Sequence, residues 1–261
     1  MTTDELVLRA GDAAAVFAAD GGRLTSLQVG GLELLVGPDA DPMRWGSYAM
    51  VPWAGRIRHG RFAFDGVGHE LPIVVPPHAI HGTAYLRPWT IDGESMRIEL
   101  GEQWPFAATA TQEVELHDDR LILRLRLQAH ERQPAMVGWH PWFRRTLGAP
   151  DGGVGGEAEL RVEPVRMFEL DDDLIPTGTA VDPGPQPWDN CFELAADPVI
   201  RWPDHLELSL GTDCRYWTIY THPPHALCVE PQTDVPDAVN RTPAVVEAGE
   251  ELSARFELAW R

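Results

Sequence analysis

The chain has 261 residues, of which 44% are hydrophobic and 23% are charged, proportions typical of a folded globular protein. Its formal net charge of −19 argues against binding to nucleic acid or to an anionic membrane surface, since both would repel it. All 21 basic residues are arginine, and the absence of lysine excludes Schiff-base chemistry and a lysine-bound pyridoxal cofactor. A neutral small molecule is therefore the expected ligand.

Membrane and secretion signals are not found in the sequence. No apolar run approaches the roughly 18 residues of a membrane span, and the start of the chain has no basic-then-apolar signal pattern. The three cysteines, Cys191, Cys214 and Cys228, lack a Cys-x-x-Cys spacing, so neither a disulfide framework nor a zinc ribbon is predicted. We expect a soluble, cytoplasmic protein with reduced cysteines.

Short turns and alternating strands follow one another along the chain. Asp-Gly-Gly at 20–22, Gly-Gly at 30–31 and Asp-Gly at 65–66 separate brief apolar runs, which predicts β-hairpins. Every second residue is apolar over 96–100, 121–127, 206–210 and 256–260, the pattern of half-buried strands. No convincing helical periodicity is present, so the sequence predicts one domain built as an antiparallel sandwich or barrel.

The first polar residue in an apolar setting is Arg56, in the stretch VPWAGRIRHGRF at 51–62. Because it lies close to Trp53 among apolar residues, we expect its guanidinium to point inward, where a forked donor can hold a ligand oxygen. Arg58 and Arg61 are expected to lie in a solvated basic turn.

Two histidines follow in PPHAIHGTAYLRPW at 76–89, namely His78 and His81. A His-x-x-His pair can ligate a metal on a helix, but the two prolines and the following glycine argue against a helix here. Residues three apart on an extended chain face opposite ways, so no metal site is predicted. His222 and His225, in THPPHA, are expected to form a proline-rigidified turn.

The stretch MVGWHPWF at 136–143 sets His140 between Trp139 and Trp142. A buried imidazole needs a partner for each ring nitrogen, so this placement costs free energy unless something there uses it. Taken alone, the pattern favours a hydrogen-bonded structural histidine, with a functional histidine as the alternative.

Two acids complete the set of candidates. Asp189 ends a proline-rich loop just before a strand, where closing the loop is the alternative to a functional role. In HALCVEPQTDVPDAVN at 225–240, Leu227 and Val229 share one strand face, whereas Cys228 and Glu230 share the other. Glu230 either anchors a loop or, with its pKa raised by apolar surroundings, serves as a proton acceptor.

Five short motifs, taken in this order, resemble the aldose 1-epimerase (galactose mutarotase) family. They are Arg-Ile at 56–57 before a glycine-punctuated hairpin, His-Gly at 81–82, His-Pro-aromatic-Phe at 140–143, Asp-x-Cys-Phe at 189–192, and Glu-Pro-Gln at 230–232 with Pro-Asp-Ala-x-Asn at 236–240. The resemblance runs from residue 55 to residue 240. It implies an all-β fold, a single large antiparallel β-sandwich over residues 1–261, with an open sugar cleft across one face.

The resemblance also implies roles for individual residues. Glu230 would be the general base and His140 the general acid, converging from opposite sides of one cleft. The substrate-binding residues would be Arg56, His81, Asp189, Trp53 and Trp142, the first three for sugar hydroxyls and the ring oxygen and the two indoles for the apolar C–H surface.

This chemistry requires only proton transfers. A proton leaves the anomeric hydroxyl while another reaches the ring oxygen, the ring opens to an aldehyde, and it recloses on the other face of C1. A carboxylate and an imidazole suit these steps because their pKa values can be brought near neutrality. We therefore expect no metal and no organic cofactor, a sugar as the partner, and a monomer or homodimer.

Three alternatives remain open. The Gly-Arg-Ile order and the Thr-Ala-Tyr insert before Arg87 lean toward divergent branches of the family, some of which act on hexose 6-phosphates; Arg58, Arg61 and Arg87 would then grip the phosphate. A non-catalytic carbohydrate-binding domain could share the same scaffold. A glycoside hydrolase would need two carboxyl groups, for which Asp189 and Glu230 are candidates.

Overall fold

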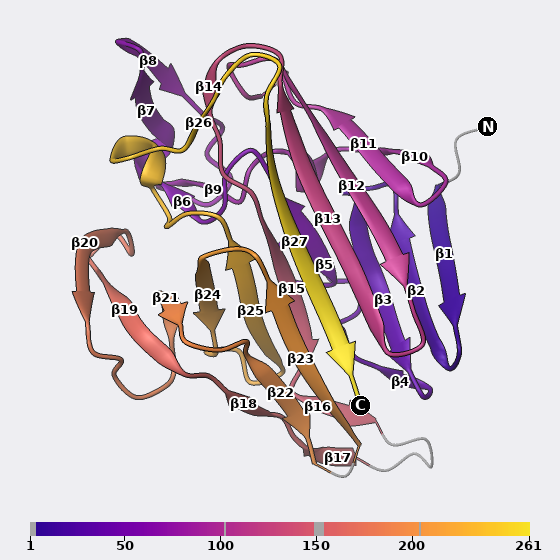
Figure 1. Cartoon of the computed structure of the whole chain (residues 1–261). Coiled ribbons are helices and arrows are strands. Elements are labelled where there is room, and N and C mark those ends of the chain that lie inside the picture. The colour runs from indigo at the N-terminus through magenta and orange to yellow at the C-terminus, as the bar shows by residue number, and fades with distance from the viewer. Residues whose placement is uncertain (1–3, 102, 149–153, 204) are drawn as a thin grey trace.

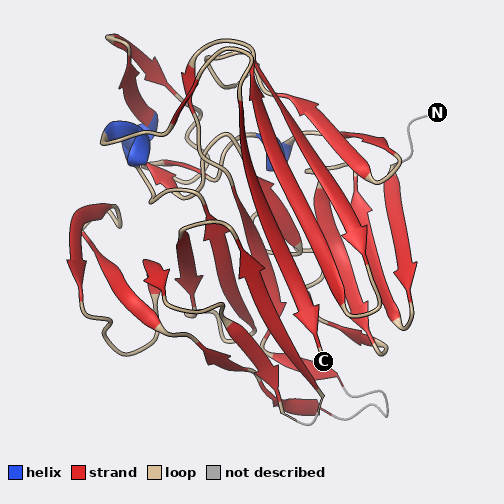
Figure 2. Ribbon diagram, viewed as in Figure 1, coloured by secondary structure: helices blue, strands red, loops and turns tan. Residues whose placement is uncertain are grey.

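The computed structural model describes residues 4–101, 103–148, 154–203 and 205–261. Within these residues, strands predominate and helix is confined to three short 3-10 turns, η1 (Arg58–Gly60), η2 (Ala84–Leu86) and η3 (Ala238–Asn240), as Figure 2 shows. None of the described helices is long and apolar enough to cross a membrane.

Two large antiparallel sheets lie one behind the other (Figure 1). The first has 11 strands in the described residues: β1 (Glu5–Ala10), β2 (Ala13–Ala18), β3 (Arg23–Val29), β5 (Ser47–Met50), β15 (Gly138–Arg144), β25 (Ala226–Gln232), β24 (Tyr216–Tyr220), β21 (Asp189–Leu194), β19 (Pro164–Leu170) and β20 (Pro176–Val181) in spatial order, with β4 (Leu32–Glu33) paired to β3.

The second large sheet has eight strands in the described residues. In spatial order they are β10 (Thr90–Asp92), β11 (Ser95–Glu99), β12 (Ala108–Leu116), β13 (Arg120–Ala129), β27 (Glu251–Trp260), β23 (Leu206–Thr212), β22 (Val199–Trp202) and β18 (Glu159–Arg161). Smaller pairs join β6 (Arg56–Ile57) to β9 (Ala79–Ile80), β7 (Arg61–Phe64) to β8 (Val67–Glu70), β14 (Gln133–Pro134) to β26 (Val245–Val246), and β16 (Thr146–Gly148) to β17 (Val154–Glu157).

The predicted antiparallel β-sandwich is confirmed, and its strands follow the predicted alternation. The four alternating segments fall on β11, β13, β23 and β27, and the turns at 20–22, 30–31 and 65–66 each join two antiparallel neighbours. On β13 the odd-numbered leucines are buried, whereas Arg124 and Arg126 face outward and pair with Glu115 and Glu113 of β12. The period of two thus separates a packed face from a charged one.

Two central strands of the 11-stranded sheet, β15 and β25, are covered on both faces. On the inner face, Leu227 and Val229 join the main core, and Trp139 packs against Phe256 of the opposite sheet. Because successive residues of a strand point to opposite faces, His140 and Glu230 lie on the outer face. That face carries the cavity described next.

Candidate active site

A cavity of about 430 Å³ lies over the outer face of β15 and β25. Its volume falls in the range of about 300–1,000 Å³ that is usual for small-molecule sites. His140 and Glu230 lie among its lining residues, together with Arg56, His81, Trp142 and Asp189, so the fold brings together six of the residues predicted for the site.

His140 and Glu230 are side by side on neighbouring strands. The antiparallel register pairs Gly138 with Gln232 and Trp142 with Cys228, so His140 stands opposite Glu230. Nε2 of His140 lies 3.3 Å from Oε1 of Glu230, and the side chains are only 7% and 3% exposed. The two groups therefore meet the cavity from the same wall, not from opposite sides of a cleft as expected.

Three aromatic neighbours hold the imidazole of His140 in place. Trp142 stacks on it with ring centroids 5.3 Å apart and planes 7° apart, and Tyr48 stacks at 5.1 Å and 28°. His81 approaches edge-on, at 4.8 Å and 86°. Flat contacts of this kind fix the ring plane, so the Nε2 atom keeps its direction toward the carboxylate.

Burial favours the neutral forms of both groups. Desolvation, followed by the charge of nearby Asp189, raises the pKa of Glu230 well above its ordinary value of 4.5. Desolvation, followed by the charge of buried Arg23, lowers the pKa of His140 from 6.5 to about 3. The pair consequently holds one proton over a broad range of pH, and that proton can be transferred.

An ion pair forms the side of the cavity next to this pair. Asp189 is the first residue of β21, and its Oδ2 lies 3.4 Å from a guanidinium nitrogen of Arg56 in β6. Both side chains are about one-quarter exposed, so each keeps hydrogen-bonding capacity for a ligand. The inward direction expected for Arg56 agrees with this position.

A sharp turn aims His81 into the cavity. Its φ is +60°, and its backbone N–H donates to the carbonyl of Gly55 at 3.0 Å. The next residue, Gly82, has φ +75°, and a Cβ there would lie 2.1 Å from the carbonyl oxygen of Val51, so only glycine fits. Burial, followed by the nearby His140, lowers the pKa of His81 well below 6.5.

The two tryptophans predicted to contact the sugar are placed differently. Trp53 packs against Trp104 in the core, with ring centroids 5.6 Å apart, and is not among the described residues that line the cavity. The prediction for Trp53 is wrong, because its apolar neighbours belong to the core. Trp142 lines the cavity, but its indole stacks on His140 and also on His225, at 6.3 Å, which leaves little of its face open.

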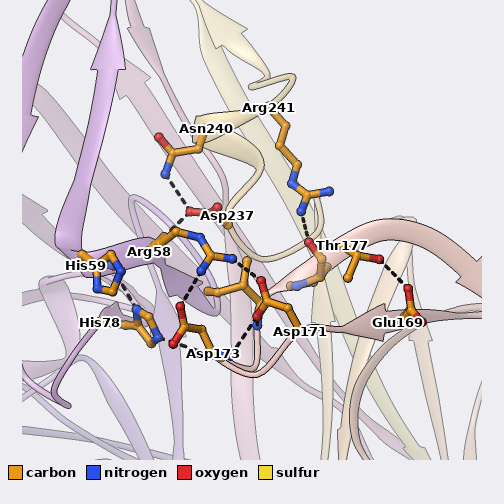
Figure 3. A network of polar contacts seen from close by, with 12 residues as sticks. Arg58, His59, His78, Glu169, Asp171, Asp173, Thr177, Asp237, Asn240 and Arg241 are labelled. Carbon is orange, nitrogen blue, oxygen red and sulfur yellow. Dashed lines mark hydrogen bonds and ion pairs between the residues drawn. The ribbon is translucent and has the colours of Figure 1, made fainter.

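A network of polar contacts supports one wall of the cavity. The 170–176 segment, which joins β19 to β20, contributes Leu170, Leu174 and Pro176 to the lining. Figure 3 shows Arg58 between two carboxylates of this segment, Asp171 and Asp173, the latter at 2.6 Å. Arg58 was expected to lie in a solvated basic turn, but its guanidinium instead pairs with two carboxylates and so links η1 to the cavity wall.

His78 belongs to the same network and not to the cavity floor. Its Nδ1 accepts from the backbone N–H of His59 at 3.0 Å, and its Nε2 lies 3.1 Å from the carbonyl oxygen of Asp173 (Figure 3). An accepting Nδ1 leaves Nε2 to donate, so both nitrogens of neutral His78 are satisfied. His78 therefore lies in the polar network and His81 lines the cavity, in agreement with the expectation that they face opposite ways.

Several residues that line the cavity or pack behind its wall were not recognised from the sequence. Tyr48 belongs to a strand buried at every position, which lacks the alternation that would assign it a face. Thr218 is the β24 partner of Glu230 in the register, which no local pattern reveals. The turn predicted at 222–225 connects β24 to β25, and both of its histidines line the cavity.

The family model for aldose 1-epimerase matches residues 4–259 of the chain. The chain belongs to the aldose 1-epimerase family. The resemblance inferred from five short motifs is thereby confirmed, and it extends over nearly the whole length of this family member. In a comparison with curated proteins, no sequence matches it.

Solved structures share the fold of this aldose 1-epimerase family member at low sequence identity. They include a galactose mutarotase-like protein from Clostridium acetobutylicum (TM-score 0.81, 18% identity, covering 98% of this chain and 95% of that one). A homologue of aldose epimerase from C. elegans has a TM-score of 0.79 at 19% identity, covering 98% of each chain. A galactose 1-epimerase from Lactobacillus acidophilus has 0.78 at 14%, covering 98% and 94%.

Proposed function

We propose that the protein is a mutarotase that interconverts the α and β anomers of a free hexose in the cytoplasm. The observation that carries this proposal is the contact of Glu230 with His140, 3.3 Å apart at the wall of a sugar-sized cavity. Family membership supports an isomerase of this type. The three cysteines, which form no disulfide, support a reducing compartment.

The proposed reaction removes a proton from the anomeric hydroxyl group and adds a proton to the ring oxygen. The anomeric hydroxyl and the ring oxygen are bonded to the same carbon, so two groups that are neighbours on one wall can reach both oxygens. Once the shared proton has moved from Glu230 to His140 across their 3.3 Å contact, Glu230 accepts the hydroxyl proton while His140 delivers its proton to the ring oxygen, and the open aldehyde recloses after rotation. Each proton transfer of this type contributes about 10²- to 10⁴-fold. The steps require no metal or organic cofactor.

Four further groups are proposed to hold the sugar. Arg56 and Asp189 offer a donor and an acceptor to hydroxyl groups beside the reacting carbon. His81 and Trp142 each have a buried ring nitrogen with no hydrogen-bond partner among the described residues, Nδ1 and Nε1 respectively. A buried polar atom without a partner is costly, and a sugar hydroxyl would satisfy each.

The charges at the cavity favour an unphosphorylated sugar over a hexose 6-phosphate. Arg58 is neutralised by its two aspartates, and Arg61 pairs with Glu70 at 3.0 Å. Neither of them, nor Arg87, is among the described residues that line the cavity. The arginines that do line it, Arg44 and Arg56, each pair with a carboxylate, so little free positive charge is left for a dianion.

Anomer exchange measured by NMR tests the proposal. Freshly dissolved α-glucose and α-galactose should equilibrate faster with the protein than without it, and a panel of free and 6-phosphorylated hexoses should favour the free sugars. Sugar binding without any acceleration would indicate a carbohydrate-binding domain and contradict the proposal. Release of reducing sugar from an aryl glycoside would instead support a hydrolase.

A further inference from the structure

Cys228 stands next to the proton-transfer pair on the same face of the sheet. It precedes Glu230 by two residues on β25, so their side chains point the same way, and His140 lies on the adjacent strand opposite Glu230. All three residues are buried, with Cys228 fully so. The thiol does not line the cavity and has no part in the proposed reaction.

The side chains of His140, Cys228 and Glu230 bring a nitrogen, a sulfur and an oxygen atom close together, and each of these atoms can bind a metal ion. A ring nitrogen of His140, Sγ of Cys228 and a carboxylate oxygen of Glu230 all lie within 4.8 Å of one another. Two atoms bound to one tetrahedral zinc ion lie about 3.4–3.6 Å apart, from bonds of about 2.3 Å to sulfur and about 2.1 Å to nitrogen or oxygen. Side-chain rotations that move these atoms by about 1 Å would therefore close the set around an ion.

Two of the three residues have unmet polar capacity. Nδ1 of His140 and Oε2 of Glu230 are buried and have no hydrogen-bond partner among the described residues. Buried polar groups of this kind require a ligand or water. A fourth position on a tetrahedral ion would face the cavity, where a water molecule or a sugar oxygen could occupy it.

The charges of the set match a divalent cation. A carboxylate and a thiolate together carry two negative charges and the imidazole is neutral, so an M²⁺ ion would make the buried assembly electrically neutral. Sulfur and imidazole ligands select zinc and cadmium over magnesium and calcium, which prefer oxygen. The net charge of the chain, −19, adds a long-range attraction for cations.

We propose that His140, Cys228 and Glu230 form a binding site for a thiophilic divalent cation of the Zn²⁺ and Cd²⁺ class, which blocks the proton-transfer pair when bound. As the metal–sulfur and metal–oxygen bonds form, the S–H bond of Cys228 and the O–H bond of the Glu230 carboxyl group break, and both protons pass to solvent. The ion then occupies the atoms that would exchange protons with the sugar. The inhibition rests on the proposed function, whereas the binding does not.

Cadmium alone, added to the metal-free full-length protein, tests the binding. Wild type should bind one Cd²⁺ per chain with an ultraviolet thiolate-to-metal absorption band, and Mg²⁺ should neither bind nor produce a band. Cys228→Ala should abolish the band and weaken Cd²⁺ binding by more than about 100-fold, since even loss of an outer partner costs about 10- to 100-fold. Cys214→Ala, which removes a half-buried thiol outside the cluster, should behave as wild type.

Three outcomes would show that the proposed metal site is wrong. Absence of a band in wild type, wild-type affinity in Cys228→Ala, or loss of the band in Cys214→Ala would each overturn the proposal. If Cys228→Ala does not fold, His140→Gln carries the same test, because it removes the nitrogen ligand and should weaken Cd²⁺ binding with the thiol intact.

Mutarotation in the presence of zinc tests the consequence. Zn²⁺ should inhibit wild type and Cys214→Ala, and a chelator should restore the rate, whereas Cys228→Ala should be active and insensitive to Zn²⁺. Zinc inhibition that persists in Cys228→Ala would contradict the proposed block. A cadmium band that behaves as expected in a protein without mutarotase activity would sustain the metal site and remove the proposed function, so the two failures are distinguishable.

Discussion

Replacing the carboxylate of Glu230 with an amide tests the proposed base directly. Glutamine has the same shape, and at a position that is 2% exposed it leaves no cavity, so Glu230→Gln should fold. The amide cannot accept the anomeric proton. The loss in kcat should be about 10²- to 10⁴-fold, the usual contribution of such a group, which corresponds to about 2.7–5.5 kcal/mol of activation free energy.

The expected KM is close to that of wild type. The amide can still form hydrogen bonds with a hydroxyl group, and the Arg56–Asp189 pair is untouched, so ground-state binding should change little. Polarimetry or NMR exchange on the preferred sugar gives kcat and KM, and thermal unfolding checks the fold.

Glu193→Gln is the matched control. Glu193 is also buried, at 9% exposed, but it pairs with Arg166 at 2.7 Å and Arg215 at 2.5 Å and does not line the cavity within the described residues. This variant should lose stability while keeping its turnover. If Glu230→Gln retained more than about one-tenth of the wild-type kcat, the loss would fall below the usual contribution of a general base, and the assignment would be refuted.

Three further outcomes follow from the geometry and charges of the cavity. The imidazole signals of His140, followed by NMR, should show no titration between about pH 4 and pH 6.5, because burial holds the pKa of His140 at about 3; an inflection of these signals near 6.5 would contradict this. His81 has a folded pKa well below its unfolded value of 6.5, so the unfolded chain binds the extra proton and wild type should lose stability as pH falls below 6.5. Relative to His81→Gln, that loss should reach about 1.4 kcal/mol per pH unit in urea unfolding at pH 8, 6 and 5, and equal pH dependence in both proteins would count against it. Arg58→Gln should release the 170–176 wall and raise KM by about two- to tenfold with kcat unchanged, since exposed ion pairs contribute modestly; an unchanged KM in steady-state assays would contradict this role of Arg58.

Local patterns were sufficient where one strand determines its own environment. The leucines at 121, 123, 125 and 127 alternate with polar residues, so they predicted both the strand and its buried face. The same reasoning separated Leu227 and Val229 from Cys228 and Glu230, and the structure places these two pairs on opposite faces of β25. Such predictions need only the period of a strand.

Local patterns failed where a partner from elsewhere in the chain decides the outcome. Trp53 lies close to Arg56 in sequence, yet its indole packs on Trp104. Arg58 was predicted to lie in a solvated turn, because its partners Asp171 and Asp173 are remote in sequence. Neighbours along the chain do not reveal partners across a sheet or a loop.

The sequence by itself determined that the chain forms alternating strands, that it belongs among the aldose 1-epimerases, and which acid and which histidine are the candidates for proton transfer. Only the tertiary structure decided that Glu230 and His140 stand side by side, 3.3 Å apart, on one wall. It also decided that burial pushes their pKa values in opposite directions. The physical reason is that register and desolvation depend on which strands become neighbours, and neighbouring strands such as β15 and β25 come from distant parts of the chain.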